Sequence, residues 1–307
     1  MAEHGMGYVP DPEGAEAFVA TLPHPTLATA GPDLKAADQD VLLYPALLAC
    51  DSKWRRGSQG NVGSCVGWGA SLAVDVLAAC DIHWRKEPEA WHGRTIESSL
   101  YGFSRVEARG QRSNTGGDGS TGFHAAKAIR DFGALHYGVD YGGTVVREEG
   151  KQQRDREWGR NGVPEVLEPY AKLRRCSETT LALSFDDCAR AISNGFGIVF
   201  CSGQGFSMSR DEDGFCKAGG VWWHCLFGGG VRFGKRPGVH IWNSWGESNT
   251  VGKHYPNDMP QAVRNCSFWA DADVIDRMCS GRDSYVYAGY SGFKPSQMPG
   301  NWLEGIL

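Results

Sequence analysis

The sequence lacks the long apolar runs that carry a chain across a membrane. No stretch approaches the ~18 consecutive apolar residues that a transmembrane helix needs. The first residues include acids where a signal peptide needs a basic region, and no apolar run follows them at once. We therefore expect no membrane partner, and a protein of the cytoplasm or one that is released without a signal.

The sequence also lacks an excess of basic charge. It holds 31 Lys and Arg against 36 Asp and Glu, a formal net charge of -5 at pH 7. Proteins that bind nucleic acid usually carry a basic surface that neutralises phosphates. We therefore expect no nucleic-acid partner. The hydrophobic share of 41% and the charged share of 22% are those of a folded protein rather than a disordered one.

Metal-binding spacings of cysteine are missing as well. Ten cysteines are present, but no Cys-x-x-Cys pair occurs among them. The even number fits disulfides, whereas the chain length, the missing export signal and the scattered spacing oppose them. We interpret most of these cysteines as small buried apolar residues, and we expect no metal and no organic cofactor.

Internal repeats and long linkers are absent, and the chain divides only at its ends. Residues 1–49 hold seven acidic side chains and one basic one, and their prolines include Pro10, Pro12, Pro23, Pro25 and Pro32. This composition predicts an extended acidic arm with a net charge of -6, laid over a nearly neutral body. The body spans residues 50–290, and a tail of residues 291–307 follows.

Helical patterns dominate the first half of the body and strand patterns the second. Helices are expected at 65–80, 122–132, 185–193 and 271–279, with Ser64, Ser120 or Thr121, and Ser184 as N-caps of the first three. Strands are expected at 197–202, 221–228, 239–243 and 284–290. Because helices and strands are segregated, the sequence predicts an α+β protein, helical over about 50–180 and β-rich over about 181–290.

One cysteine differs from the others in its position. Cys65 begins the first predicted helix, where the helix dipole and unpaired N–H groups stabilise a thiolate. Gln59 lies six residues earlier on a glycine-rich approach. Its side-chain amide and the Cys65 backbone N–H are two donors that could stabilise an oxyanion.

Two polar residues far downstream complete the pattern. His224 can pair with a thiolate, and Asn243 can fix the imidazole ring through its other nitrogen. The alternative is a buried structural thiol and an ordinary core histidine. Gln, Cys, His and Asn in this order favour the chemical interpretation.

With these residues the sequence resembles the papain-like cysteine peptidases. The resemblance rests on the order Gln, Cys, His, Asn, the six-residue step from Gln59 to Cys65, the Gly-Ser-Cys entry and the Asn-Ser-Trp-Gly run at 243–246. It covers about residues 51–290. Val62 stands where the family signature has Cys, Val66 replaces an aromatic residue, and the separations to His and Asn are longer than usual. With these departures, the sequence resembles a divergent bacterial or phage-type member of the papain-like family.

The resemblance implies a fold and a set of roles. The fold would be a helical lobe and a β-barrel-like lobe with the cleft between them. Cys65 would be the nucleophile, His224 the general base and acid, Asn243 the residue that orients His224, and Gln59 part of the oxyanion hole. The reaction would be hydrolysis of a peptide or protein substrate through a thioester.

The resemblance also implies residues that bind the substrate. Trp245 would shield the Asn243–His224 bond from water, with ordinary core packing as the alternative. Gly63, Gly119 and Ser120 would offer backbone to an extended peptide, with Gly116 and Gly117 as the alternative to Gly119. The loop could equally be a simple helix entry.

Two other functions stay open at this point. One is a lysin that cleaves cell-wall peptides, and the other is a structural protein, associated with a virion, that retains the fold. The acidic arm could cover the cleft as a short prosegment or pack as a permanent part of the fold. Because no inhibitor pattern is visible, we expect the permanent part.

Overall fold

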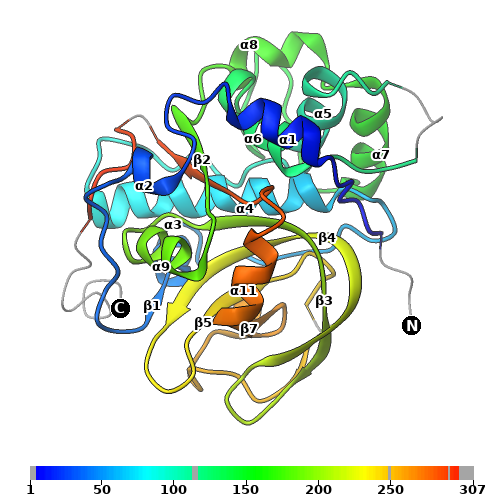
Figure 1. Cartoon of the computed structure of the whole chain (residues 1–307). Helices are drawn as coiled ribbons and strands as arrows, with labels where there is room; N and C mark the ends of the chain where they lie inside the picture. The colour runs from blue at the N-terminus through cyan, green and yellow to red at the C-terminus, as the bar shows by residue number, and fades with distance from the viewer. Residues whose placement is uncertain (1–4, 113–116, 248–249, 290, 297–307) are drawn as a thin grey trace.

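A long apolar helix, α4 (Cys65–Cys80), runs through the middle of the protein, with helices alone on one side and most of the strands, together with further helices, on the other (Figure 1). The computed structural model describes residues 5–112, 117–247, 250–289 and 291–296. Fourteen of the sixteen residues of α4 are buried. Cys65–Arg85 is long and apolar enough to cross a membrane, but 83% of its apolar window is buried inside the protein, as in a core helix.

The other helices surround α4 and the sheet. They are α1 (Pro12–Val19), α2 (Leu27–Ala30), α3 (Tyr44–Cys50), α5 (Glu97–Gly102), α6 (Gly122–Asp131), α7 (Lys151–Asn161), α8 (Glu168–Ala171), α9 (Phe185–Ser193), α10 (Gln261–Arg264) and α11 (Ala272–Cys279), with short π or 3-10 turns at η1 (Asp81–Arg85), η2 (Phe103–Ala108) and η3 (Glu165–Leu167).

The strands form one mostly antiparallel sheet in the order β2-β8-β3-β4-β5-β7, with β1 on β4 and β6 on β3. They are β1 (Val41–Leu42), β2 (Glu178–Leu181), β3 (Ile198–Arg210), β4 (Cys216–Arg232), β5 (Gly238–Trp242), β6 (Val251–Gly252), β7 (Ser267–Asp271) and β8 (Tyr285–Ala288). This path ends at β2 and β7, so within the described residues the sheet is open and not the closed barrel that the resemblance suggested.

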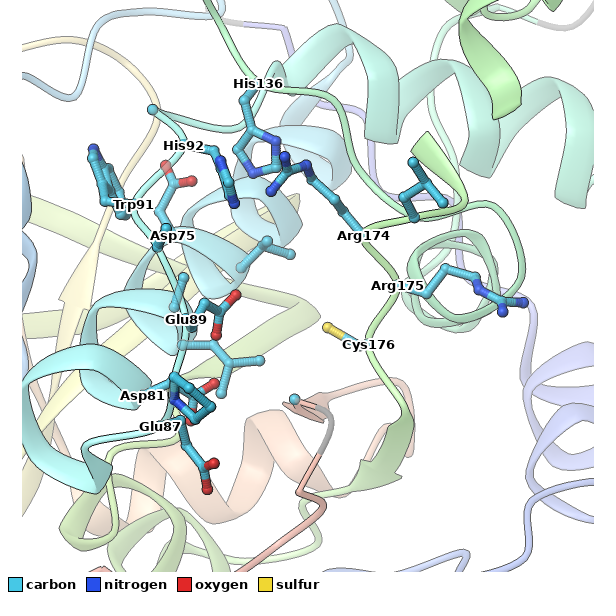
Figure 2. Close-up of a pocket in the computed structure, with 18 of the residues that line it drawn as sticks. Asp75, Asp81, Glu87, Glu89, Trp91, His92, His136, Arg174, Arg175 and Cys176 are labelled. Carbon is cyan, nitrogen blue, oxygen red and sulfur yellow. The ribbon is translucent and has the colours of Figure 1, made fainter. Parts of the chain in front are cut away.

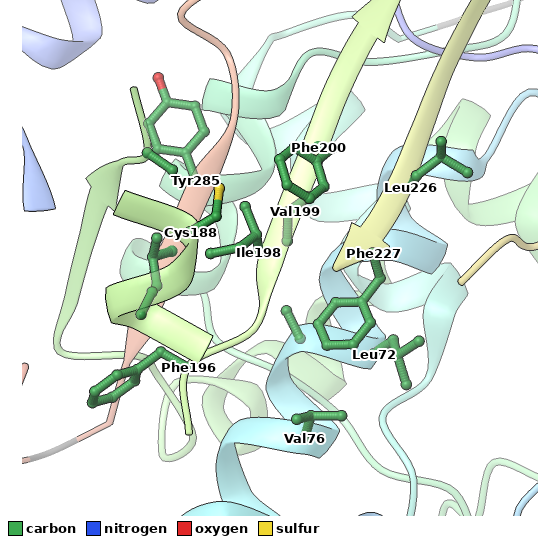
Figure 3. Close-up of a cluster of buried hydrophobic side chains, with 14 of the residues drawn as sticks. Leu72, Val76, Cys188, Phe196, Ile198, Val199, Phe200, Leu226, Phe227 and Tyr285 are labelled. Atoms are coloured by element: carbon green, nitrogen blue, oxygen red, sulfur yellow. The ribbon is translucent and has the colours of Figure 1, made fainter. Parts of the chain in front are cut away.

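The core lies where α4 packs against the sheet (Figure 3). Leu72 and Val76 of α4 face Phe227 of β4, and Phe200 of β3 lies on the neighbouring strand. All four side chains are fully or almost fully buried. Burying side chains of this size contributes about 1.5–3 kcal/mol each. This contact fixes α4, and with it Cys65, relative to β3 and β4.

The predicted side-chain caps are confirmed for Thr121 and Ser184 but not for Ser64, whose hydroxyl makes no capping hydrogen bond. Helix α4 has the predicted bounds. The hydroxyls of Thr121 and Ser184 accept hydrogen bonds from the backbone N–H groups of His124 and Asp187, at 3.0 and 3.2 Å, at the starts of α6 and α9. Helix α11 begins at Ala272, one residue later than predicted. The predicted strands are present, and β3 and β4 extend well beyond them.

The prediction of an extended arm is wrong for most of its length. Residues 12–50 contain α1, α2, β1 and α3, and their apolar side chains belong to the main core. Asp11 accepts a hydrogen bond from the Gly14 N–H at 3.0 Å and so caps α1. Pro12 occupies the first turn, where its missing N–H costs nothing. Pro12 therefore begins a helix instead of preventing one.

Candidate active site

Cys65 lies at the first residue of α4, at the end of a loop that is tied to residues 243–246. The Gln59 N–H donates to the Ser244 carbonyl at 3.0 Å, and Ser58 forms an antiparallel bridge with Trp245. These contacts place the glycine-rich approach beside the Asn-Ser-Trp-Gly run. The structure thus brings together two motifs that are about 180 residues apart in the sequence.

His224 and Asn243 form a direct side-chain pair. The distance from His224 Nε2 to Asn243 Oδ1 is 2.8 Å. An amide oxygen only accepts hydrogen bonds, so Nε2 carries a proton and donates it. This bond assigns the other ring nitrogen, Nδ1, to proton exchange with a neighbouring group. Both side chains are almost completely buried.

Trp245 covers this pair. Its ring stacks on the His224 ring with a centroid distance of 4.6 Å and an interplanar angle of 30°. The Trp222 ring also packs against the Trp245 ring, and the two ring centroids are 4.7 Å apart. The indole therefore separates the imidazole from solvent, in the place where shielding was expected.

The Gln59 amide is fixed by hydrogen bonds at both its oxygen and its nitrogen. Its Oε1 accepts a hydrogen bond from the Ser244 hydroxyl, which fixes the orientation of the amide. Its Nε2 donates to the Val62 carbonyl at 2.8 Å and to the Gly5 carbonyl at 2.7 Å. Sequence reasoning missed the role of Ser244, although this residue lies inside the motif that identified Asn243.

The Cys65 thiol lies against β4. It is fully buried, and it accepts hydrogen bonds from the backbone N–H groups of Cys225, Gly7 and Val66. Burial raises the pKa of the Cys65 thiol well above its ordinary value, and the neighbouring Cys225 thiol raises it further. The N–H groups act in the opposite direction but do not outweigh burial. The thiolate expected from the helix dipole is therefore not favoured in this closed form.

Part of this burial comes from the chain's own N-terminal segment, residues 5–9, here called the arm tip. The arm tip passes the end of α4 that bears Cys65 (Figure 1). Its backbone is held at three points: Gly5 N–H to the Gly60 carbonyl at 3.1 Å, Tyr8 N–H to the Trp223 carbonyl at 3.1 Å, and Val9 N–H to the Ser120 carbonyl at 2.8 Å. Sequence reasoning did not locate this segment.

The residues expected to bind an extended peptide contact the arm tip. The Ser120 N–H donates to the Gly7 carbonyl at 2.9 Å. A Cβ atom at Gly119 would lie 2.7 Å from the same carbonyl oxygen, and one at Gly7 would lie 1.9 Å from the Gly63 carbonyl oxygen. Gly63, Gly119 and Ser120 thus approach the arm tip as closely as backbones can.

The alternative to Gly119 is only partly described. Gly116 lies outside the described residues. A Cβ atom at Gly117 would meet no atom within 4 Å, so this residue does not press against the arm tip. In the described part of the loop, the close backbone contact therefore comes from residues 119 and 120.

The Tyr8 side chain is the anchor of the arm tip. It is buried, and its hydroxyl hydrogen-bonds to Asp283. The Asp283 carboxylate also accepts the backbone N–H groups of Gly122 and Phe123 at 2.8 and 2.7 Å, at the start of α6. Burial nevertheless raises the pKa of Asp283 to about 7.

A second buried carboxylate supports the residues around Cys65. Asp155 of α7 accepts hydrogen bonds from the Ser64 hydroxyl at 2.6 Å and from the Trp68 indole N–H at 3.0 Å. Ser98 donates to its other oxygen. Burial raises the pKa of Asp155 to about 6, although these donors lower it.

Among the described residues, no group of three or more His, Cys, Asp or Glu side chains has the arrangement of a metal site. All ten cysteines lie within the described residues and are free thiols.

No protein-family model matches the sequence, and no curated protein does so. Solved structures do match. Xylellain, a cysteine protease from Xylella fastidiosa, is 14% identical over 93% of this chain and 91% of its own, with a TM-score of 0.53. Procathepsin B S9 from Trypanosoma congolense is 10% identical over 96% of this chain and 87% of its own, with a TM-score of 0.51. At these identities the likeness shows the papain-like fold alone.

Proposed function

We propose that this protein is a cysteine peptidase in which Cys65 is the nucleophile. The observation that carries the proposal is the 2.8 Å hydrogen bond from His224 to Asn243, in a site that also holds a cysteine at a helix N-terminus and an oriented Gln59 amide. A buried structural thiol needs none of these partners. A nucleophile, a base and a residue that orients the base form the minimum set for acyl transfer.

The reaction follows from this arrangement. His224 takes the proton of the Cys65 thiol, and the thiolate attacks a peptide carbonyl carbon. The developing oxyanion accepts hydrogen bonds from Gln59 Nε2 and the Cys65 backbone N–H. His224 then gives its proton to the leaving amine as the thioester forms, and water hydrolyses the thioester with His224 as the base.

The closed form holds this reaction back. Gly5 places its carbonyl oxygen on Gln59 Nε2, which is the donor proposed for the oxyanion. Gly7 places its N–H on the Cys65 thiol. A substrate therefore has to displace the arm tip before it can react. Displacement also exposes the thiol to water, which removes part of the burial that raises the pKa of Cys65.

The test is intact mass after treatment with a peptidyl epoxide that alkylates papain-like thiolates. Wild type should gain one adduct and Cys65→Ala none, while Cys216→Ala, which removes another buried thiol, should react like wild type. With a peptide substrate, Cys65→Ala should lose nearly all turnover. Asn243→Ala and Gln59→Ala should lose roughly 10- to 1000-fold in kcat, as expected for an orienting group and one oxyanion donor.

The complete burial of Cys65 favours one alternative, a protein that keeps the fold for a structural role, including association with a viral particle. Equal labelling of wild type and Cys65→Ala, or full activity in Cys65→Ala, would refute the peptidase and leave this alternative. If the peptidase is supported, clearing of a cell-wall suspension would narrow the substrate to wall peptides.

A further inference from the structure

A cavity of about 570 Å³ lies at the end of α4 that is opposite to Cys65 (Figure 2). Its walls come from the last turns of α4 and η1, from residues 87–93 that follow η1, from His136, and from residues 173–176 that follow α8. Pockets of this size are typical of small-molecule sites. None of the residues that line this cavity belongs to the candidate active site.

Basic side chains gather at one end of the cavity. Figure 2 shows His92, His136 and Arg174 close together there. The rings of His92 and His136 have centroids 6.2 Å apart. His136 is only 7% exposed, and its Nδ1 has no hydrogen-bond partner among the described residues. A buried polar atom of this kind is costly unless something satisfies it.

Arg174 has no partner of opposite charge at this end. It forms no ion pair within 4.0 Å in the part of the chain that the structure describes, unlike Arg94 close by, which pairs with Glu148. Burial, and after it the charges of Arg174 and His92, lower the pKa of His136 to about 3. His136 is therefore neutral at neutral pH, and Arg174 is the cationic side chain that an anion at this end of the cavity would meet.

Carboxyl groups follow another side of the cavity. Asp81, Glu87 and Glu89 lie there one beside another (Figure 2). Burial raises the pKa of Asp81 and of Glu89, and Glu87 raises both further. Arg85 acts in the opposite direction on both, and Arg174 does so on Glu89. Arg85 is the one basic side chain bonded to this group in the described residues, and it is held by Asp81 and the Asn194 carbonyl. A cation beside Glu87 and Glu89 would relieve the repulsion that remains.

The surface between the two charged sides is mostly uncharged. Leu77, Trp91 and Cys176 contribute apolar atoms to it. Asp75 also lines the cavity, but its carboxyl accepts the Thr95 N–H at 2.8 Å, and burial raises its pKa to about 7. Asp75 therefore carries only part of a negative charge at neutral pH. The cavity thus separates a positive end from a negative side across a short apolar surface.

We propose that this cavity binds a small zwitterion, an amino acid or a short peptide with a free ammonium and a free carboxylate. The carboxylate would lie on Arg174 and His136, and the ammonium beside Glu87 and Glu89. A simple anion or a simple cation would satisfy only one of the two sides. This inference does not depend on the activity proposed for Cys65.

The experiment is isothermal titration of the full chain with glycylglycine as the probe, compared with N-acetylglycine, glycinamide and N-acetylglycinamide. These analogues keep only the negative charge, only the positive charge, or neither. Glycylglycine should bind, each singly charged analogue should bind at least tenfold more weakly, and N-acetylglycinamide should not bind. Both charges are needed because each side of the cavity is relieved by only one of them.

Three variants locate the site. Arg174→Gln should weaken glycylglycine at least tenfold and abolish binding of N-acetylglycine, while leaving glycinamide unchanged. Glu89→Gln should also weaken glycylglycine at least tenfold, but it should abolish binding of glycinamide and leave N-acetylglycine unchanged. Lys172→Gln removes a nearby exposed cation that does not line the cavity, and it should bind like wild type. All three positions are at the surface or half-buried, so thermal unfolding should be unchanged and should verify the fold.

Two results would overturn the proposal. One is a failure of glycylglycine to bind wild type at millimolar concentration. The other is binding that is equal for glycylglycine and N-acetylglycinamide, or equal in wild type, Arg174→Gln and Glu89→Gln. Neither result bears on Cys65, whose labelling is measured separately.

Discussion

At the scale of single residues, the hydroxyl of Ser244 decides which way the Gln59 amide points. Because this hydroxyl donates to Gln59 Oε1, the amide nitrogen has to face the Val62 and Gly5 carbonyls. Without the hydroxyl, the two orientations of the amide become closer in free energy. Ser244 would then act on the reaction through Gln59 and not by touching the substrate, as a positioning residue.

We predict that Ser244→Ala lowers kcat by roughly tenfold and leaves KM within about twofold, since an oxyanion donor acts mainly on the transition state. Steady-state kinetics with a peptide substrate would measure the split. Ser280→Ala, which removes an exposed hydroxyl at the end of α11, is the matched control and should match wild type. An unchanged kcat in Ser244→Ala would exclude the positioning role.

Asp155 gives a prediction about pH. Its pKa is about 6 in the folded protein against 3.8 for the ordinary value, so between these pH values the folded state binds more protons than the unfolded state. The contribution of Asp155 to stability is therefore largest below about pH 4 and falls as the pH rises to 6. Asn does not titrate. The stability difference between wild type and Asp155→Asn should shrink by about 2 kcal/mol from pH 4 to pH 7.

Urea unfolding of both proteins at the two pH values would measure this change. Asp131→Asn, a half-buried carboxyl on α6, serves as the control, and its stability difference from wild type should change far less. A difference for Asp155→Asn that grows with pH would show that the three hydrogen bonds outweigh burial and keep the carboxyl ionised.

At the scale of elements, the arm tip is the segment on which access to Cys65 depends. It is held by backbone hydrogen bonds and by the Tyr8 side chain, and Gly7 leaves no room for a larger residue. A segment with so few anchors opens at a small cost in free energy. Access to the thiol should therefore be set by this segment and not by unfolding of the body.

We predict that Gly7→Val raises the rate at which iodoacetamide alkylates Cys65 by at least tenfold, because a Cβ atom there would lie 1.9 Å from the Gly63 carbonyl oxygen. Mass spectrometry of the Cys65 peptide measures the rate, with the buried Cys266 as internal reference. Met6→Val changes an exposed neighbour and should label like wild type. Equal rates in all three proteins would mean that the arm tip does not limit access.

Elements with local signals could be predicted, and those without them could not. The capping residues of α6 and α9 lie directly before an apolar periodic stretch, so the sequence locates both helices. Helix α7 buries only Asp155, Trp158 and Gly159, which gives no stripe to detect. Prolines at this density indicate an extended chain, whereas Pro12 occupies a position where proline favours a helix.

The residues of the candidate site also fall into those that the sequence could predict and those that it could not. Gln59, Cys65, His224 and Asn243 occur in short runs of distinctive residues, so a resemblance could identify them before the structure placed them. The arm tip binds through backbone groups, and a short glycine-rich stretch has no periodicity that would reveal this. Asp155 and Asp283 are acids among many in the sequence, and only burial distinguishes them.

At the scale of the whole molecule, the arm belongs to the body except at its tip. Phe18 of α1 packs against Phe123 of α6 and Tyr285 of β8, with both ring centroids at 5.9 Å, and Val41 pairs with Val231 of β4. These contacts join the arm to both the helices and the sheet. Removing the arm would therefore expose the core and not merely uncover the cleft.

We predict that Phe18→Ala lowers the free energy of unfolding by about 3 kcal/mol, the usual cost of truncating a buried aromatic ring. Chemical denaturation would measure it. Val166→Ala, at a side chain that is 70% exposed, should change stability by less than about 0.5 kcal/mol. A loss below about 1 kcal/mol in Phe18→Ala would mean that the arm is only loosely attached.

The ten free cysteines can report local opening in different parts of the folded protein. Nine are buried and Cys50 is half-buried, and they are spread over the molecule: Cys65 under the arm tip, Cys176 at the cavity, and Cys188 and Cys279 between α9 and α11. A buried thiol reacts only when its surroundings open. The order in which the thiols are alkylated under native conditions would therefore rank these regions by how often each one opens locally. No engineered probe is needed.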